Sequence, residues 1–170
     1  MRISLAFVAT GLIATPAMAG EMTVNVEIPR LKVAEYHKPY VAIWVENGQG
    51  QAVANLDVWY DVDMRKAEGL KWLPDLRTWW RRTGRSLKMP VAGVSGPTQG
   101  PGKYALKFTD GARPLGKLAP GSYTLRIEAA RDVGGRETLG IPFQWPPRKA
   151  ATGSAQGQTE LGAVSLVLKP

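Results

Sequence analysis

The chain has 170 residues, 44% of them hydrophobic, with 22 basic residues, 14 acidic residues and a formal net charge of +8. It has no cysteine, which excludes disulfides, thiolate metal ligands and cysteine nucleophiles. A chain of this length folds without such cross-links, because it buries about 68–70% of the surface of its unfolded state.

The first 19 residues have the pattern of a secretory signal peptide. Arg2 supplies the positive charge, and residues 5–13 form an apolar run that is too short to span a bilayer. Ala17 and Ala19 are the small residues that signal peptidase requires. We predict cleavage after Ala19 and a periplasmic location; an uncleaved anchor is the alternative. A basic periplasmic protein does not meet nucleic acid, so its expected anions are lipid head groups, phosphorylated cofactors and acidic protein surfaces.

Most of the remaining chain alternates apolar and polar residues with a period of two, which predicts β-strands. The strand expected at residues 40–46 is apolar on both faces and should therefore lie in the centre of a sheet. A turn at residues 47–50 should join it to the next strand as a hairpin. The other expected strands are residues 22–28, 52–60, 104–108, 123–129, 139–145 and 161–168.

About seven short strands with frequent turns predict an all-β fold, an immunoglobulin-like antiparallel β-sandwich that forms one domain over residues 20–170. A small barrel is the alternative. Residues 71–102 should form an insertion between strands. Residues 147–158 are small, polar and rich in glycine, and we expect them to be a flexible loop. The charged residues between 128 and 137 flank a turn and should form surface pairs of small individual energy.

The first half of the insertion combines tryptophan with positive charge. A short helix is expected at residues 74–82, because Pro74 suits a first helical turn and the apolar residues fall on one face. Tryptophan can stack on a flat ligand, and arginine can pair with its phosphate. The candidate ligand-binding side chains are Trp79, Trp80, Arg81 and Arg82. Alternatively, the tryptophans only attach the helix to the sheet while the arginines extend into solvent.

The second half of the insertion is a loop rich in glycine and proline that contains two hydroxyl groups. Gly93 and Gly96 allow a partner to approach the backbone closely. Ser95 and Thr98 offer the hydroxyls, but no general base is adjacent in the sequence. The pattern alone predicts a surface turn.

His37 is the only histidine, and it precedes the expected central strand. It could ligate haem or another metal, or it could be a hydrogen-bonded residue at a strand edge. A single histidine without cysteine or clustered carboxylates predicts no metal site. Because the chain also lacks a Gly-x-Ser-x-Gly nucleophile motif, a hydrolase is the least supported function.

Six stretches spread over the chain carry a family resemblance. They are residues 36–46, 71–77, 79–82, 128–137, 141–145 and 160–162. In these stretches the chain resembles a family of predicted periplasmic bacterial proteins of unknown function. Members are often encoded beside PepSY-type transmembrane proteins and an FAD:protein FMN transferase. The resemblance implies a cellular context and no defined activity.

The resemblance also implies a cofactor. Targets of the flavin transferase carry FMN as a phosphoester on threonine or serine, within a pattern similar to Asp/Asn-Gly-x-Ser/Thr-Gly-Ala-Thr/Ser. Residues 92–98 have Ala92 in place of the acid and Pro97 in place of alanine. The positions that match are Gly93, Ser95, Gly96 and Thr98. The resemblance therefore implies FMN attached at Thr98; a degenerate flavin site that is kept for its shape is the alternative.

We interpret the chain as a non-enzymatic periplasmic accessory protein of a membrane-associated redox or iron-reduction system, which carries FMN or docks on a PepSY-type partner. If FMN is attached at Thr98, nearby cations should neutralise its phosphate and Trp79 or Trp80 should cover its ring. Those cations are Arg81, Arg82, Arg85 and Lys88. The alternative is a non-redox binding module for an anionic ligand or an envelope protein.

Overall fold

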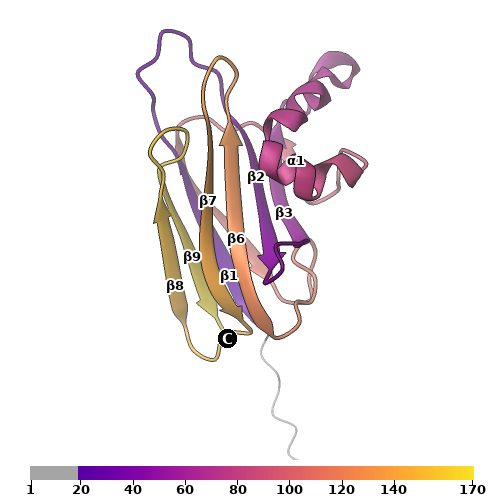
Figure 1. Ribbon diagram of the computed structural model, residues 1–170, viewed down its shortest axis with the longest axis vertical. Helices are drawn as coiled ribbons and strands as arrows, with labels where there is room; N and C mark the ends of the chain where they lie inside the picture. The colour runs from indigo at the N-terminus through magenta and orange to yellow at the C-terminus, as the bar shows by residue number, and fades with distance from the viewer. Residues whose placement is uncertain (1–18) are drawn as a thin grey trace, which may run out of the picture.

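The computed structural model describes residues 19–170, which form two packed β-sheets with a helical segment outside one of them (Figure 1). The four-stranded sheet has the order β5 (Gly102–Thr109), β1 (Glu21–Ile28), β9 (Ala163–Lys169), β8 (Ala151–Gln156). The five-stranded sheet has the order β4 (Ser95–Pro97), β3 (Ala52–Tyr60), β2 (Tyr40–Asn47), β6 (Gly121–Ala130), β7 (Arg136–Trp145). Two separate sheets confirm the predicted sandwich and exclude the barrel. The predicted signal peptide lies outside the described residues, except for Ala19.

All paired strands are antiparallel except β3 and β4, which are parallel. The seven predicted strands are present, but two further strands were missed. The expected flexible loop at residues 147–158 was wrong, because residues 151–156 form β8 and pair with β9. β8 is a mostly exposed edge strand of small residues, so it lacks the apolar alternation that reveals other strands. A Cβ at Gly153 would lie 2.5 Å from Cγ2 of Ile141, so glycine is required there.

The main core lies between the sheets and consists of the inward side chains of alternating residues. In β1 these are Met22, Val24, Val26 and Ile28, each at most 2% exposed. β2 contributes alternate residues to this core and the intervening ones to a second core on its outer face. The predicted central position of this strand is therefore confirmed, because it needs apolar side chains on both faces.

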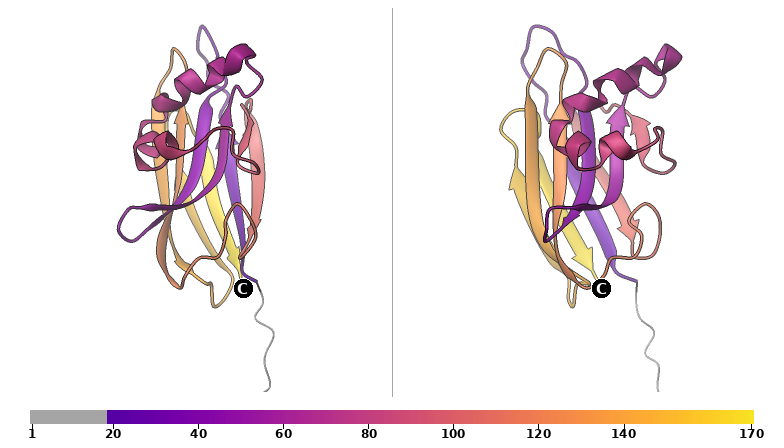
Figure 2. Two further views of the ribbon diagram at one scale, coloured as in Figure 1. Left: turned by 90° about the vertical axis from the view of Figure 1, so that its right-hand side faces the viewer. Right: turned by 45° about the vertical axis from the view of Figure 1, so that its right-hand side comes forward.

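The second core lies under the helical segment, which consists of η1 (Arg65–Asp75), α1 (Arg77–Arg82) and η2 (Gly84–Ser86). Figure 2 shows this segment lying across the outside of the five-stranded sheet. Its Leu73, Leu76 and Trp79 cover Trp44 and Val58 of the sheet. Each such fully buried side chain contributes about 1.5–3 kcal/mol relative to exposure.

The prediction of a helix at residues 74–82 placed the start of the helix too early. Pro74 lies near the end of the 3-10 helix η1, and α1 begins at Arg77. The start is set by Glu128 of β6, whose carboxylate accepts hydrogen bonds from the backbone N–H groups of Thr78 (3.1 Å) and Trp79 (2.8 Å). A carboxylate suits these positions because the first N–H groups of a helix lack partners within it.

Among residues 19–170 three carboxylates are buried, and an arginine donates a hydrogen bond to each. The pairs are Arg126 with Glu46, Arg136 with Glu128 and Arg131 with Glu160. The expectation of weak surface pairs between residues 128 and 137 was therefore wrong for Glu128, which is 0% exposed. A buried carboxylate must be fully hydrogen-bonded, so these pairs constrain the structure more than exposed pairs do.

Replacing Glu128 by glutamine should lower the free energy of unfolding by about 2 kcal/mol, because an amide cannot satisfy two backbone donors and an arginine. Glu68→Gln is the matched control, since Glu68 is half exposed and pairs only with Lys71 at 3.5 Å. The control should change stability by less than about 0.5 kcal/mol. Urea denaturation of both variants measures the difference, and equal effects would contradict the proposed importance of the buried carboxylate.

Candidate functional site

A cavity of about 520 Å³ lies at the end of the sandwich where the helical segment and the β1–β2 loop meet. Figure 1 shows both segments at this end, opposite the C-terminus. Four parts of the chain that are distant in sequence contribute to the walls. The lining residues are Tyr36, His37, Lys38, Tyr40, Asp61, Met64, Trp72, Asp75, Thr98, Ala130 and Asp132.

Thr98 lies at this cavity, and its hydroxyl Oγ1 donates a hydrogen bond to Oδ1 of Asp61 at 3.1 Å. The strand pairing explains the contact. β4 pairs in parallel with β3, so Tyr60 lies opposite Pro97 and the next residues of both strands, Asp61 and Thr98, are neighbours. Pro97 is compatible with this pairing because it ends an edge strand, where its missing N–H is not needed.

Tyr40 forms the base of the same cavity. Its hydroxyl donates to the carbonyl oxygen of Gly69 at 3.1 Å and lies 3.5 Å from Oδ2 of Asp61. Burial raises the pKa of Tyr40 to about 12, so the group remains a neutral hydrogen-bond donor at physiological pH. Tyr36 also lines the cavity, and within residues 19–170 its buried hydroxyl has no hydrogen-bond partner.

The loop that contains the other candidate residues is not the expected surface turn, because Ser95, Gly96 and Pro97 form the strand β4. The exposed edge of β3 provides the pairing partner, which no pattern within the loop could indicate. The hydroxyl of Ser95 accepts a hydrogen bond from the backbone N–H of Val91 at 2.9 Å and so closes its own loop. Gly93 has φ = +74°, a conformation that favours glycine.

The two candidate tryptophans lie away from this cavity, on α1. Trp79 is 0% exposed, and its indole Nε1 donates to Oδ1 of Asn55 in β3 at 2.8 Å. Trp80 is partly buried beside it, with ring centroids 6.2 Å apart. Trp79 therefore packs the helix onto the sheet, and its ring is not accessible to a ligand.

The structure does not bring Arg82 to Thr98. The Arg82 side chain lies 3.7 Å from Glu46 and beside Gly50, in the turn that precedes β3. Thr98 lies beyond the other end of β3, and at about 3.3 Å per residue the two ends are on the order of 30 Å apart. Arg81 is exposed on α1 and does not line the Thr98 cavity.

Sequence reasoning missed the residues that do surround Thr98. They are Asp61 after β3, Lys38 before β2 and Trp72 in η1, whose side chain is 50% exposed. Lys38 and Trp72 fall within stretches that carry the family resemblance, which is the one signal that could have singled them out. An adjoining cavity of about 470 Å³ shares Asp75 and Asp132 and adds Arg77.

His37 also lines the cavity, with Nε2 at 2.8 Å from Oε1 of Glu35. In the described part of the chain, no three His, Cys, Asp or Glu side chains are grouped to hold a metal ion. None of the helices within residues 19–170 has the length and apolar character needed to cross a membrane.

A family model described as "Predicted periplasmic protein (DUF2271)" matches residues 21–163, a range that contains strands β1 to β8 and the residues that line the cavity at Thr98. No curated protein and no solved structure matches the chain.

Asp57 lies on β3, the strand that pairs with β4, and its pKa predicts how the stability of the protein depends on pH. Burial raises the pKa of Asp57 to about 6, although hydrogen bonds from Trp59 and the Val58 N–H lower it in part. The folded state therefore binds a proton more tightly than the unfolded state, and this stabilisation is lost as the pH rises from about 4 to 6. Over that range, wild-type stability should fall by about 2 kcal/mol more than that of Asp57→Asn. Urea denaturation at several pH values tests this; parallel pH profiles would refute it.

Proposed function

Since the chain belongs to the DUF2271 family of predicted periplasmic proteins, we propose that it is a non-enzymatic accessory protein of a membrane-associated redox or iron-reduction system and carries FMN on Thr98. The observation that carries the proposal is the position of Thr98. Its hydroxyl lies at a cavity and is hydrogen-bonded to the carboxylate of Asp61. PepSY-type membrane proteins or other envelope redox proteins are the proposed electron partners.

The residues at this cavity suit a covalently held flavin. Its volume of about 520 Å³ lies within the range of cofactor sites, about 300–1,000 Å³. Trp72 and Met64 offer exposed apolar surface for a planar ring, and Lys38 offers a positive charge for the phosphodiester. FMN would supply the electron chemistry, and these residues would hold it and limit its contact with water.

Asp61 supplies a carboxylate that the local sequence lacks at Ala92. In the proposed modification, Oγ1 of Thr98 bonds to the flavin-side phosphorus of FAD, the pyrophosphate bond breaks and AMP leaves. The proton on Oγ1 must be removed, and Oδ1 of Asp61 already accepts a hydrogen bond from it at 3.1 Å. We therefore propose that Asp61 orients the hydroxyl and accepts its proton.

Coexpression of the mature protein with an FAD:protein FMN transferase should add the mass of FMN less one water, as measured on the intact chain. Thr98→Ala should abolish the addition, whereas Ser95→Ala is the matched control and should retain it, because the Ser95 hydroxyl bonds within its own loop. An unmodified wild-type chain would overturn the flavin proposal.

Asp61→Asn should reduce the initial rate of FMN addition at least ten-fold, and Ala92→Asp in the same chain should restore part of it. Near-ultraviolet circular dichroism checks that the Asn variant keeps the native packing around its tryptophans. Equal rates for wild type and Asp61→Asn would remove the role of Asp61 and leave the flavin proposal standing.

A non-redox binding module for an anionic ligand or envelope protein is the second candidate. The observation that favours it is that Arg77 and Arg81 of α1 are exposed and form no ion pair within residues 19–170. Replacing both by alanine should weaken retention on a phosphate-bearing matrix more than replacing Lys103 and Lys107, which removes the same charge from β5. Equal losses of retention by the two double variants would show that net charge alone explains the binding.

A further inference from the structure

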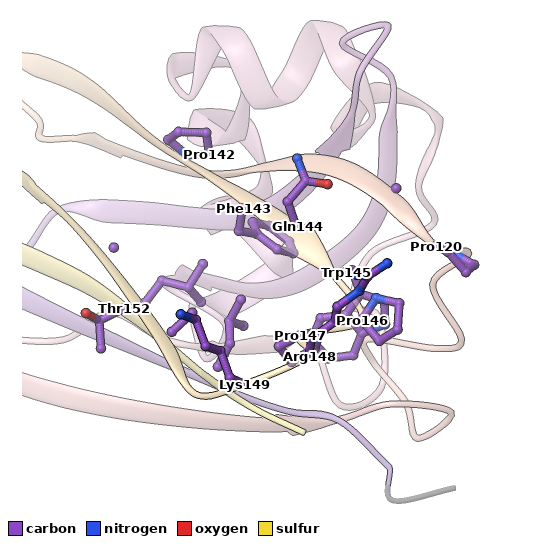
Figure 3. A pocket seen from close by; sticks show the side chains of 15 residues that line it. Pro120, Pro142, Phe143, Gln144, Trp145, Pro146, Pro147, Arg148, Lys149 and Thr152 are labelled. Atoms are coloured by element: carbon purple, nitrogen blue, oxygen red, sulfur yellow. The ribbon is translucent and has the colours of Figure 1, made fainter.

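A second cavity, of about 780 Å³, lies at the opposite end of the sandwich from Thr98. It opens where the last residues of β7 and the first residues of β8 meet, at the edges of the two sheets (Figure 3). Both strands are edge strands, so no further strand closes the gap between them. Its interior is lined by core side chains, among them Phe143, Trp145, Leu166 and Leu168.

The charged residues that line this groove are all basic. Arg148 and Lys149 lie in the segment between β7 and β8, both are exposed, and no acidic side chain lines the groove. In Figure 3, Lys149 stands between Thr152 of β8 and the prolines that follow β7. The groove therefore combines an apolar interior with a positively charged opening.

The β7 side of the groove is poorly suited to an added peptide strand. Such a strand would need the free backbone N–H groups of an edge strand. Pro142 lies within β7, and Pro146 and Pro147 follow it, so three positions along this edge have no N–H to donate. The absence of these donors disfavours a peptide and leaves the apolar side chains as the main binding surface.

We propose that this groove binds a single-chain amphiphile with an anionic head group. The acyl chain lies against Phe143, Trp145 and Leu166, where burial of methylene groups drives binding. The carboxylate or phosphate of the head pairs with Arg148 and Lys149 at the opening. The shared chemistry fits either a free fatty acid or an anionic lysophospholipid, and it is independent of any flavin at Thr98.

Titration calorimetry of the delipidated mature protein with saturated carboxylates of increasing length tests the proposal. The affinity should rise roughly four-fold per added methylene until the groove is full. Primary alcohols of the same length should bind at least ten-fold more weakly, because they lack the charge. The absence of binding, or an affinity that does not depend on chain length, would overturn the proposal.

Charge reversal separates this site from general attraction to a basic protein. Arg148→Glu with Lys149→Glu should weaken binding at least ten-fold. The matched control is Lys103→Glu with Lys107→Glu, which makes the same change in net charge on β5, at the other side of the sandwich, and should leave binding unchanged. Equal effects of the two double variants would refute the site.

A third variant blocks the groove without altering its charge. Thr152→Trp places a large side chain at the opening, on an exposed position of the edge strand β8. It should abolish binding of the longest carboxylate while the thermal midpoint stays near that of wild type; unchanged binding would count against the groove. A parallel titration with an anionic lysophospholipid distinguishes the two classes of ligand, fatty acid and lysophospholipid. The ligand that binds more tightly has the head group that better matches the opening.

Discussion

The hydrogen bonds from the start of α1 to Glu128 hold together the end of the molecule that contains the candidate site. The carboxylate comes from β6 of the five-stranded sheet and is fully buried, so it cannot exchange these partners for water. It fixes α1 on the outer face of the sheet, and α1 in turn positions η1, which supplies Trp72 and Asp75 to the cavity at Thr98. The Arg136 side chain of β7 donates a hydrogen bond to the same carboxylate.

Much of the sandwich could be predicted from the sequence because its strands bury one face or both. Residues 22–28 alternate strictly, and residues 40–45 are apolar throughout, so their places in the sheets followed from simple patterns. β4 and β8 could not be predicted in this way. Both lie at sheet edges and consist of small residues, and what makes them strands is an available neighbour in space.

The candidate site was only partly predictable for a related reason. Thr98 was singled out by its local motif, but the motif contains none of the groups that surround the hydroxyl. Asp61, Lys38 and Trp72 come from three other segments and meet Thr98 only through the parallel pairing of β3 with β4 and the docking of η1. Arg82, close in sequence, is carried towards the opposite end of β3, because α1 crosses the sheet. Proximity along the chain was therefore a poor guide to proximity in space.

Because β4 is short, the proposed modification of Thr98 can follow the folding of the sandwich. Only three residues attach the Thr98 segment to the sheet, at an outer edge and on one side. Releasing them leaves the core between the two sheets intact, so the Thr98 segment can separate from the folded sandwich at low energetic cost. An enzyme that modifies Thr98, as proposed above, would therefore be able to act on the folded molecule and would not compete with folding. Modification and folding would then be separable steps.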